Sequence, residues 1–321
     1  MCLLQLTMKK PPAQAINSDY IVFDYFTTPR FQNEPRDDEK PLAIMHIPKT
    51  AGTSVITGIS QYLKTDREVR GIDRLLLGAF DRFSEFDEEV ARTIYLDESK
   101  MPDSRLIMGH FSYHTLTNRY PGAQLLTFLR EPLSRLLSHW VYWRCMSDEY
   151  LVRWGSWRDC IKLSRHTLKE FLTDPRIACQ TDNLATRMLV WPDERIGNDS
   201  FINPDHDSRL LRNALNRLNS VAYCDIIENQ QFHQNLNRWF NTDLPMMHLN
   251  PTARVPENLR IRLDRELDSE TLSLLDDRCR LDAKLWSLLA KRRLPAGTKI
   301  ASFQQHITMR AIARYGALLA P

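Results

Sequence analysis

The sequence predicts an α/β protein built in three layers, with a central parallel sheet flanked by helices and a helical C-terminal part. Two observations lead to this prediction. From Leu42 onward, short apolar runs alternate with stretches of helical periodicity, which is typical of parallel strands joined by crossover helices. After Asp268 the pattern is entirely helical, which we interpret as a cap on the same domain.

Four apolar runs are the expected strands of this sheet. They are LAIMHI (42–47), RLIMG (105–109), QLLTFL (124–129) and VAYCDII (221–227). Short runs of this kind, placed between helical stretches, are what buried parallel strands look like in a sequence.

The helices are indicated by apolar residues that recur on one face. This pattern follows Ser54 and again Pro132, a residue that suits the first position of a helix. Further helices are expected at 165–173, 180–190, 207–218, 230–240 and 269–292. We therefore predict one domain at residues 41–321, preceded by an N-terminal extension at residues 1–40 with one strand-like stretch, YIVFDYF (20–26).

Composition limits the classes of function. The chain of 321 residues is 43% hydrophobic and 26% charged, which is enough for a substantial core. Its net charge of +3 at pH 7 is too small to predict a nucleic-acid partner, so any anion site must be local. At the start, MCLLQLTMKKPP, the apolar stretch before the lysines and prolines is too short for a membrane span or for the core of a signal peptide. We therefore expect a cytoplasmic protein without an integral membrane segment.

The cysteines indicate neither a zinc site nor a redox motif. All 6 are scattered without a C-x-x-C pair, and buried free thiols are the expected outcome, although the even count also permits disulfides. They are Cys2, Cys145, Cys160, Cys179, Cys224 and Cys279.

The stretch HIPKTAGTS (46–54) is the first candidate binding element. A strand that runs through a small-residue turn into a helix collects free backbone N–H groups and the positive end of the helix dipole, and such a point binds phosphate-like anions. Lys49 adds a full charge, and Gly52 permits close approach of the backbone. Hydroxyl donors follow from Thr50, Thr53 and Ser54, although Thr53 and Ser54 can also cap the helix. The spacing is not that of an ATP-binding Walker loop, because Lys49 precedes the glycine.

The stretch TFLREPLSRLLSHW (127–140) is the second candidate. Arg130 falls at the carboxyl end of an expected strand, where ligands collect in open parallel sheets. Ser138 lies in about the second turn of the helix that Pro132 opens. A guanidinium and a hydroxyl can converge on one phosphate there. Taken singly, Arg130 is better explained by a surface ion pair, and Ser138 is better explained as a serine that the helix tolerates.

Together, HIPKTAGTS and LREPLSRLLSHW resemble the 5′-phosphosulfate loop and the 3′-phosphate element of sulfotransferases that use 3′-phosphoadenosine 5′-phosphosulfate (PAPS). The resemblance is to the carbohydrate branch, which includes heparan sulfate and uronyl 2-O-sulfotransferases, and covers Leu42 to Arg292 as a pattern. It implies a P-loop-like fold and sulfuryl transfer from PAPS to a hydroxyl of a glycan or glycoconjugate. It assigns Arg130 and Ser138 to the 3′-phosphate, and to the 5′-phosphosulfate it assigns Lys49, Thr50, Ala51, Gly52, Thr53 and Ser54.

The catalytic residues follow from the same resemblance. Within LIMGHFSYH (106–114), His110 matches the histidine that removes the proton of the acceptor hydroxyl, while Lys49 neutralises charge on the bridging and leaving oxygens. A second histidine of some relatives is Met108 here. We expect no metal, because Lys49 and the helix N-terminus do the neutralising. His110 and His114 have the spacing of a helical metal pair, but no glutamate adjoins the first histidine.

Two further stretches resemble family segments. CQTDNLATRML (179–189) matches a segment near the acceptor, which makes Asn183 and Arg187 candidate substrate-binding residues, with a solvent-facing helix surface as the alternative. LNPTARVP (249–256) falls where relatives carry a mobile loop over the cofactor. Its Asn250, Thr252 and Arg254 are candidate contacts, or simply a polar turn.

Two other functions stay open at this point. A P-loop kinase of small hydroxyl compounds would use VAYCD (221–225) as a metal-binding strand end, and a non-catalytic nucleotide- or glycan-binding protein would keep the fold without turnover. The sequence leaves undetermined the acceptor, the position sulfated and the oligomeric state.

Overall fold

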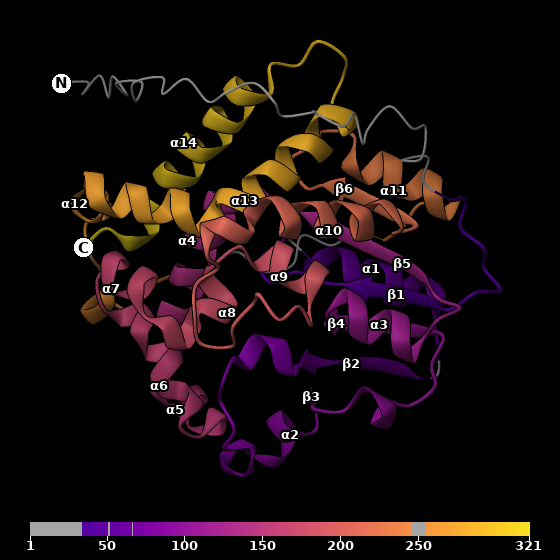
Figure 1. Ribbon diagram of the computed structural model, residues 1–321, viewed down its shortest axis with the longest axis horizontal. Coiled ribbons are helices and arrows are strands. Elements are labelled where there is room, and N and C mark those ends of the chain that lie inside the picture. Colours follow the sequence, from indigo (N-terminus) through magenta and orange to yellow (C-terminus); the bar gives the residue numbers. More distant parts are fainter. Residues whose placement is uncertain (1–33, 51, 66, 246–253) are drawn as a thin grey trace. The chain divides into compact units, whose positions relative to one another are not determined.

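The computed structural model describes residues 34–50, 52–65, 67–245 and 254–321 (Figure 1). The strand-like stretch at 20–26 and Cys2 lie outside the described residues. The large compact unit of the chain runs from Asn33 to Pro321 and contains every element discussed below.

The segment immediately before the first strand is fastened to this unit. The backbone N–H of Glu34 donates to the carbonyl of Ala222 over 3.1 Å, and the indole of Trp239 donates to the Glu34 carbonyl over 2.5 Å. The side-chain oxygen of Gln124 accepts from the backbone N–H of Asp37 over 2.8 Å. Residues 34–40 therefore pack on the sheet domain instead of extending away from it.

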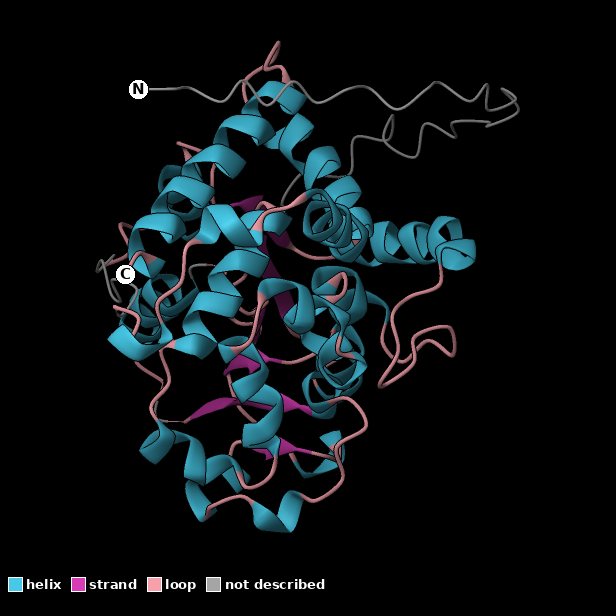
Figure 2. Ribbon diagram, turned by 90° about the vertical axis from the view of Figure 1, so that its left-hand side faces the viewer, coloured by secondary structure: helices cyan, strands magenta, loops and turns pink. Residues whose placement is uncertain are grey.

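In the described part of the chain, six parallel strands form one sheet in the order β3-β2-β4-β1-β5-β6 (Figure 2). Their bounds are β1 Leu42–Met45, β2 Glu68–Asp73, β3 Ile94–Tyr95, β4 Leu106–His110, β5 Gln124–Leu129 and β6 Tyr223–Ile226. The predicted parallel sheet and its four apolar strands are thus confirmed. The strands β2 and β3 were not predicted.

The strand order brings three chain segments together at one edge. β1 lies between β4 and β5, and Met45 pairs with Gly109 on one side and Thr127 on the other. Because all strands are parallel, the residues that follow β1, β4 and β5 leave the sheet at the same edge. Gly109 permits the pairing of β4 with β2, since a Cβ at this position would lie 2.2 Å from the carbonyl oxygen of Gly71.

Helices cover both faces of the sheet. Leu42 and Ile44 of β1 point to the face covered by α1 (Gly52–Leu63) and α11 (Phe232–Phe240), whose apolar residues share one buried cluster with them. The crossover through α1 moves along the sheet toward β2, while the crossover through α3 (Tyr113–Arg119) moves the other way toward β5. Right-handed crossovers place such helices on opposite faces, which gives the predicted flanking layers.

The remaining helices form a second apolar core beside the sheet. The predicted helix after Pro132 is α4 (Pro132–Arg144), with proline at its start, and its Leu136, Leu137, Trp140 and Val141 are fully buried. Each such side chain contributes about 1.5–3 kcal/mol by burial. The other helices are α2 Glu88–Ala91, α5 Asp148–Leu151, α6 Trp157–Lys162, α7 Leu168–Thr173, α8 Ala178–Thr181, α9 Leu184–Val190, α10 Asp207–Asn219, α12 Leu263–Glu266, α13 Ser269–Arg293 and α14 Ile300–Leu319.

The helical tail belongs to the same domain, as expected. Both α13 and α14 contact α4, and α13 also contacts β6 (Figure 1). The helix expected at 180–190 is divided, because Asn183 adopts a left-handed backbone conformation (φ 47°, ψ 51°) between α8 and α9.

Four of the cysteines are buried free thiols, as predicted: Cys160, Cys179, Cys224 and Cys279. Burial raises the pKa of Cys160 and Cys224 to about 11, so these thiols are unreactive near neutral pH. None of the helices in the described ranges is long and apolar enough to cross a membrane.

Candidate functional site

The loop that follows β1 is a tight turn held under backbone strain. Lys49 has a positive φ of 70°, a conformation that costs a non-glycine residue about 1–2 kcal/mol. The backbone N–H and the hydroxyl of Thr50 both donate to the Ile47 carbonyl, over 3.3 and 2.8 Å. Thr50 therefore fixes the shape of the turn, and in this structure both of its donors are used there. Strain of this kind collects at functional sites.

The ammonium group of Lys49 lies against an aromatic ring. Its Nζ is 3.8 Å from the ring centre of Tyr142 on α4, a cation–π contact. Burial, and secondly the positive charge of Arg130, lower the pKa of Lys49 to about 8. Within the described residues no carboxylate oxygen lies within 4.0 Å of this nitrogen. Lys49 is thus a cation without a counter-ion in the described part of the chain.

Arg130 connects the two sequence motifs. One terminal nitrogen of its guanidinium donates to the Lys49 carbonyl over 3.0 Å, and the other donates to the Tyr315 hydroxyl on α14 over 3.0 Å. As with Lys49, no described carboxylate lies within 4.0 Å of it. Two cationic residues that follow the adjacent strands β1 and β5 therefore lie side by side.

The helix α4 presents one face to this point. Glu131 caps its start by accepting from the backbone N–H groups of Leu133 and Ser134, over 3.3 and 2.8 Å. Ser138 and Tyr142 are four residues apart and therefore share a face of the helix. Since Tyr142 contacts Lys49, Ser138 lies on the side of α4 that faces the loop, and it is buried there.

Arg135 is a site residue that the sequence analysis did not assign. It is 3% exposed, its one hydrogen bond runs over 3.3 Å to the Gln180 carbonyl, and two of its guanidinium nitrogens, Nε and Nη1, have no partner among the described residues. It lines a cavity of about 10 Å³, close to the smallest that holds one water molecule. Thr50, Arg130, Asp282 and Trp286 also line this cavity. The sequence signal was its position three residues before Ser138, on the same face of the helix that Pro132 opens.

His110 ends β4 beside the same loop. Its Nδ1 lies 2.6 Å from the carbonyl oxygen of His46, and the two imidazole rings are 4.6 Å apart. Because a carbonyl oxygen only accepts, Nδ1 carries the hydrogen, and the lone pair of the neutral ring is on Nε2. Burial lowers the pKa of His110 below its ordinary 6.5, and Lys49 lowers it further, so His110 is neutral at pH 7 and can accept a proton.

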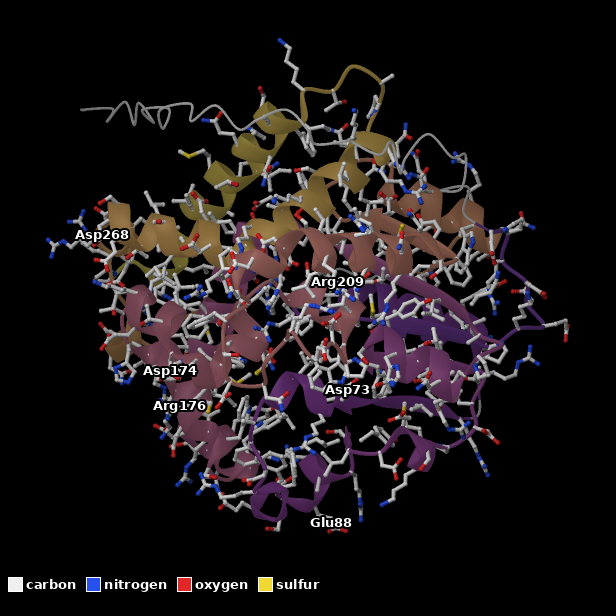
Figure 3. All side chains as sticks on the ribbon, in the orientation of Figure 1. Asp73, Glu88, Asp174, Arg176, Arg209 and Asp268 are labelled. Atoms are coloured by element: carbon white, nitrogen blue, oxygen red, sulfur yellow. The ribbon has the colours of Figure 1, made fainter. Side chains whose placement is uncertain are left out.

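A buried carboxylate supports the segment after His110. Asp73, labelled in Figure 3, ends β2 and accepts from the backbone N–H of Ser112 and the hydroxyl of Thr115, over 2.9 and 2.7 Å. These bonds fix the start of α3 and, through it, the direction in which the chain leaves His110. The sequence analysis did not assign this role to Asp73.

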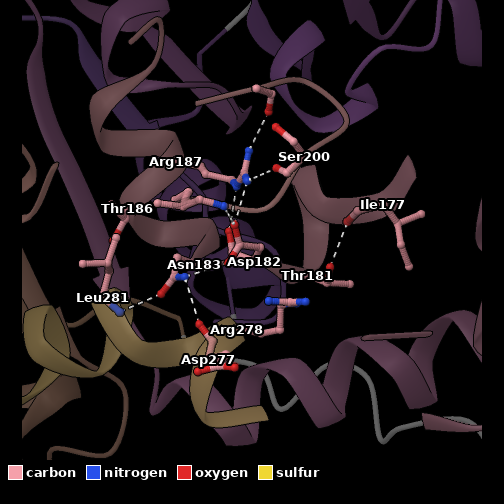
Figure 4. Close-up of polar contacts among 12 residues, drawn as sticks. Ile177, Thr181, Asp182, Asn183, Thr186, Arg187, Ser200, Asp277, Arg278 and Leu281 are labelled. Atoms are coloured by element: carbon pink, nitrogen blue, oxygen red, sulfur yellow. Dashed lines mark hydrogen bonds and ion pairs between the residues drawn. The ribbon is translucent and has the colours of Figure 1, made fainter. Parts of the chain in front are cut away.

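Asn183 and Arg187 lie in an internal network and not at a surface (Figure 4). They are 1% and 0% exposed, so the alternative of a solvent-facing helix is wrong. The side-chain oxygen of Asn183 accepts from the backbone of Leu281 over 2.7 Å. The guanidinium of Arg187 pairs with Asp182 over 2.7 Å and donates to the carbonyls of Gly197 and Ser200. The predicted contact with the acceptor stays a prediction, since both side chains already make their hydrogen bonds within the protein.

The remaining predicted residues are only partly described. Ala51, Asn250 and Thr252 lie outside the described residues, as do the side chains of Gly52 and Thr53. Ser54 is the third residue of α1.

The possible metal pair of His110 and His114 is not supported. His114 contacts Asn118, one turn further along α3, over 2.9 Å. No group of three or more potential metal ligands gathers anywhere in the described ranges.

Comparison with known proteins adds nothing to these observations: no protein-family model and no curated protein matches the chain. The likeness to sulfotransferases rests on the motifs themselves.

Proposed function

We propose that the protein is a PAPS-dependent sulfotransferase with a P-loop-like fold that transfers a sulfuryl group to a hydroxyl, expected on a glycan or glycoconjugate. The observation that carries the proposal is the hydrogen bond of 3.0 Å from Arg130 to the Lys49 carbonyl, which joins the two anion-binding motifs. His110, on the neighbouring strand β4, adds a neutral base at the same edge of the sheet.

The residues present suit a ligand with several negative charges. Lys49 and Arg130 have no counter-ion among the described residues, and the buried Arg135, which lines the same small cavity as Arg130, adds a third positive charge nearby. Buried or half-buried cations normally pair with anions, so a bound phosphate would satisfy this site. Arg130 and Ser138 would hold the 3′-phosphate. Lys49 and the first-turn N–H groups of α1 would hold the 5′-phosphosulfate.

Lys49 and His110 would carry out the steps of sulfuryl transfer. PAPS, when bound, supplies an activated sulfuryl group. Lys49 orients that group and stabilises the charge on the oxygen it leaves. Nε2 of His110 takes the proton of the acceptor hydroxyl as the new oxygen–sulfur bond forms and the bond to the phosphate breaks. General-base catalysis of this kind is worth about 10²- to 10⁴-fold in rate.

The position of Asp225 argues against the alternative of a P-loop kinase. Asp225 is buried within β6, accepts from Asn229 Nδ2 over 3.1 Å, and has its pKa raised by burial. A carboxylate enclosed in this way is not the exposed metal ligand at the end of a strand that a P-loop kinase needs.

Calorimetric binding of adenosine 3′,5′-bisphosphate, with ATP for comparison, tests the proposal. Binding of the bisphosphate in preference to ATP, weakened in Arg130→Ala, is expected. Indifference to the 3′-phosphate would overturn the proposal. If the bisphosphate binds, transfer of ³⁵S-labelled sulfate from PAPS to a panel of glycans separates an enzyme from a non-catalytic binding protein.

A further inference from the structure

The C-terminal helix α14 is packed into the candidate site. Its buried residues Ala311, Tyr315 and Leu319 recur every four positions and share a cluster with the apolar residues of α4. Nearer its start, Gln304 donates to Glu131, the cap of α4, over 3.3 Å. α14 is therefore fixed against the element that carries Arg135 and Ser138.

Tyr315 is the residue of α14 that reaches the cationic centre. Its hydroxyl oxygen accepts from Arg130 over 3.0 Å, although the two residues are 185 positions apart in the sequence. An arginine only donates, so the tyrosine hydroxyl keeps its own hydrogen. Among the described residues, Arg130 is the only hydrogen-bond partner of this hydroxyl. Its hydrogen is consequently a donor without a protein acceptor.

This arrangement has a direct consequence for an anion at Arg130. A phosphate oxygen beside the terminal nitrogen that bonds Tyr315 would also lie near the tyrosine hydroxyl. Tyr315 is 1% exposed, and a buried donor without an acceptor is unfavourable, so an arriving phosphate would satisfy it. The ring itself is held by the apolar cluster and needs no hydroxyl for its packing.

We propose that Tyr315 is a further anion ligand that donates its hydroxyl hydrogen to the phosphate bound by Arg130. The 3′-phosphate site is then shared between the β5–α4 motif and the C-terminal helix. This inference rests on the proposed function, in which Arg130 binds the 3′-phosphate.

The first test is Tyr315→Phe, which removes the hydroxyl and keeps the ring in the core. Dissociation constants are measured by calorimetry for adenosine 3′,5′-bisphosphate and for 5′-AMP, which lacks the 3′-phosphate. We expect bisphosphate binding to weaken about 10- to 100-fold, as for loss of one hydrogen bond to a charged group, with 5′-AMP binding unchanged. Tyr120→Phe is the matched control, because it also removes the hydroxyl of a buried tyrosine, one that donates to the carbonyl of Pro102 in the segment before β4.

The second test separates a ligand from a residue that only positions Arg130. Tyr315→Phe is repeated in the Arg130→Ala background, with weak binding followed by ligand-observed NMR. A direct contact keeps its effect when Arg130 is gone, whereas a positioning role loses it and overturns the inference. If the wild type prefers the bisphosphate and Tyr315→Phe binds it equally well, the inference alone fails. If the wild type shows no such preference, the proposed function fails with it.

Discussion

Arg187 and Arg130 differ in whether the protein itself supplies a negatively charged partner. Arg187, a residue of α9, is fully buried, pairs with Asp182 over 2.7 Å and donates to backbone carbonyls (Figure 4). Arg130, at the end of β5, donates to the Lys49 carbonyl and the Tyr315 hydroxyl and has no described carboxylate within 4.0 Å. The first arginine is neutralised by the protein, whereas the second has no counter-ion among the described residues, and we propose that it binds an external anion.

The comparison predicts which substitutions damage the reaction and which damage the fold. At the site, groups are oriented but not neutralised, so their removal should reduce activity or binding while the fold persists. In the Arg187 network, removal of either charged partner, Arg187 or Asp182, leaves the other charge buried and unpaired, so stability should fall instead.

The largest effect is expected for His110→Ala. The neutral imidazole, held by the His46 carbonyl, is the proposed base, and its loss should lower kcat by about 10²- to 10⁴-fold without a change in melting temperature. Sulfuryl transfer from PAPS to a responsive glycan measures it. His114→Ala, at a half-exposed position on α3, is the control and should keep its activity. Equal losses in both variants would contradict the assignment.

The next largest effect is on stability, in Arg187→Ala. Breaking the buried pair leaves Asp182 charged in the interior and should reduce the free energy of unfolding by about 3–5 kcal/mol. Urea denaturation measures the change. Arg176→Ala removes a more exposed pair with Asp174 and should cost no more than about 1 kcal/mol. A stable Arg187→Ala protein with impaired acceptor binding would restore the substrate role that burial argues against.

Arg130→Ala should weaken ligand binding and leave stability nearly unchanged, the reverse of what we expect for Arg187→Ala. Loss of a charged donor to phosphate costs about 1.5–3 kcal/mol, so the dissociation constant of adenosine 3′,5′-bisphosphate should rise roughly 10- to 100-fold. The free energy of unfolding should change little, because no carboxylate is left unpaired. Unfolding of this variant at room temperature would show that Arg130, like Arg187, is structural.

The sequence predicted the parts of the molecule that local patterns determine. β1, β4, β5 and β6 are apolar because they are buried, and the residues that follow parallel neighbours meet at one edge. β2 escaped prediction because its six residues, EVRGID, include Arg70, whose side chain is 55% exposed. β3 has only two residues, too few for any periodicity.

Local sequence patterns could not predict contacts between segments that are far apart in the chain. Asn183 read equally well as a ligand or a surface residue, because its partner Leu281 lies 98 positions away on α13. Tyr315 carried no motif at all, since its contact with Arg130 depends on how α14 packs on α4. Patterns identify a residue's chemical type, while tertiary packing decides whether its charge is already satisfied.

The smallest expected effect is the pH dependence of anion binding. The pKa of Lys49 in the free protein is lowered to about 8. The amine is therefore fully protonated well below pH 8, and its positive charge is lost as the pH rises through this value. Above about pH 7, where the phosphates of the ligand are fully ionised, bisphosphate affinity should fall, by up to about tenfold per pH unit above pH 8. Calorimetry from pH 7 to 9.5 measures this.

Lys49→Arg is the matched control for this titration, since a guanidinium stays charged throughout the range. Its affinity should be flat with pH even if it is lower overall. A wild type with no change up to pH 9.5 would mean that Lys49 does not contact the anion. The contrast between the candidate site and the buried Arg187 network would then depend on Arg130 alone. Lys49 would be a cation that contacts the ring of Tyr142 and not a ligand.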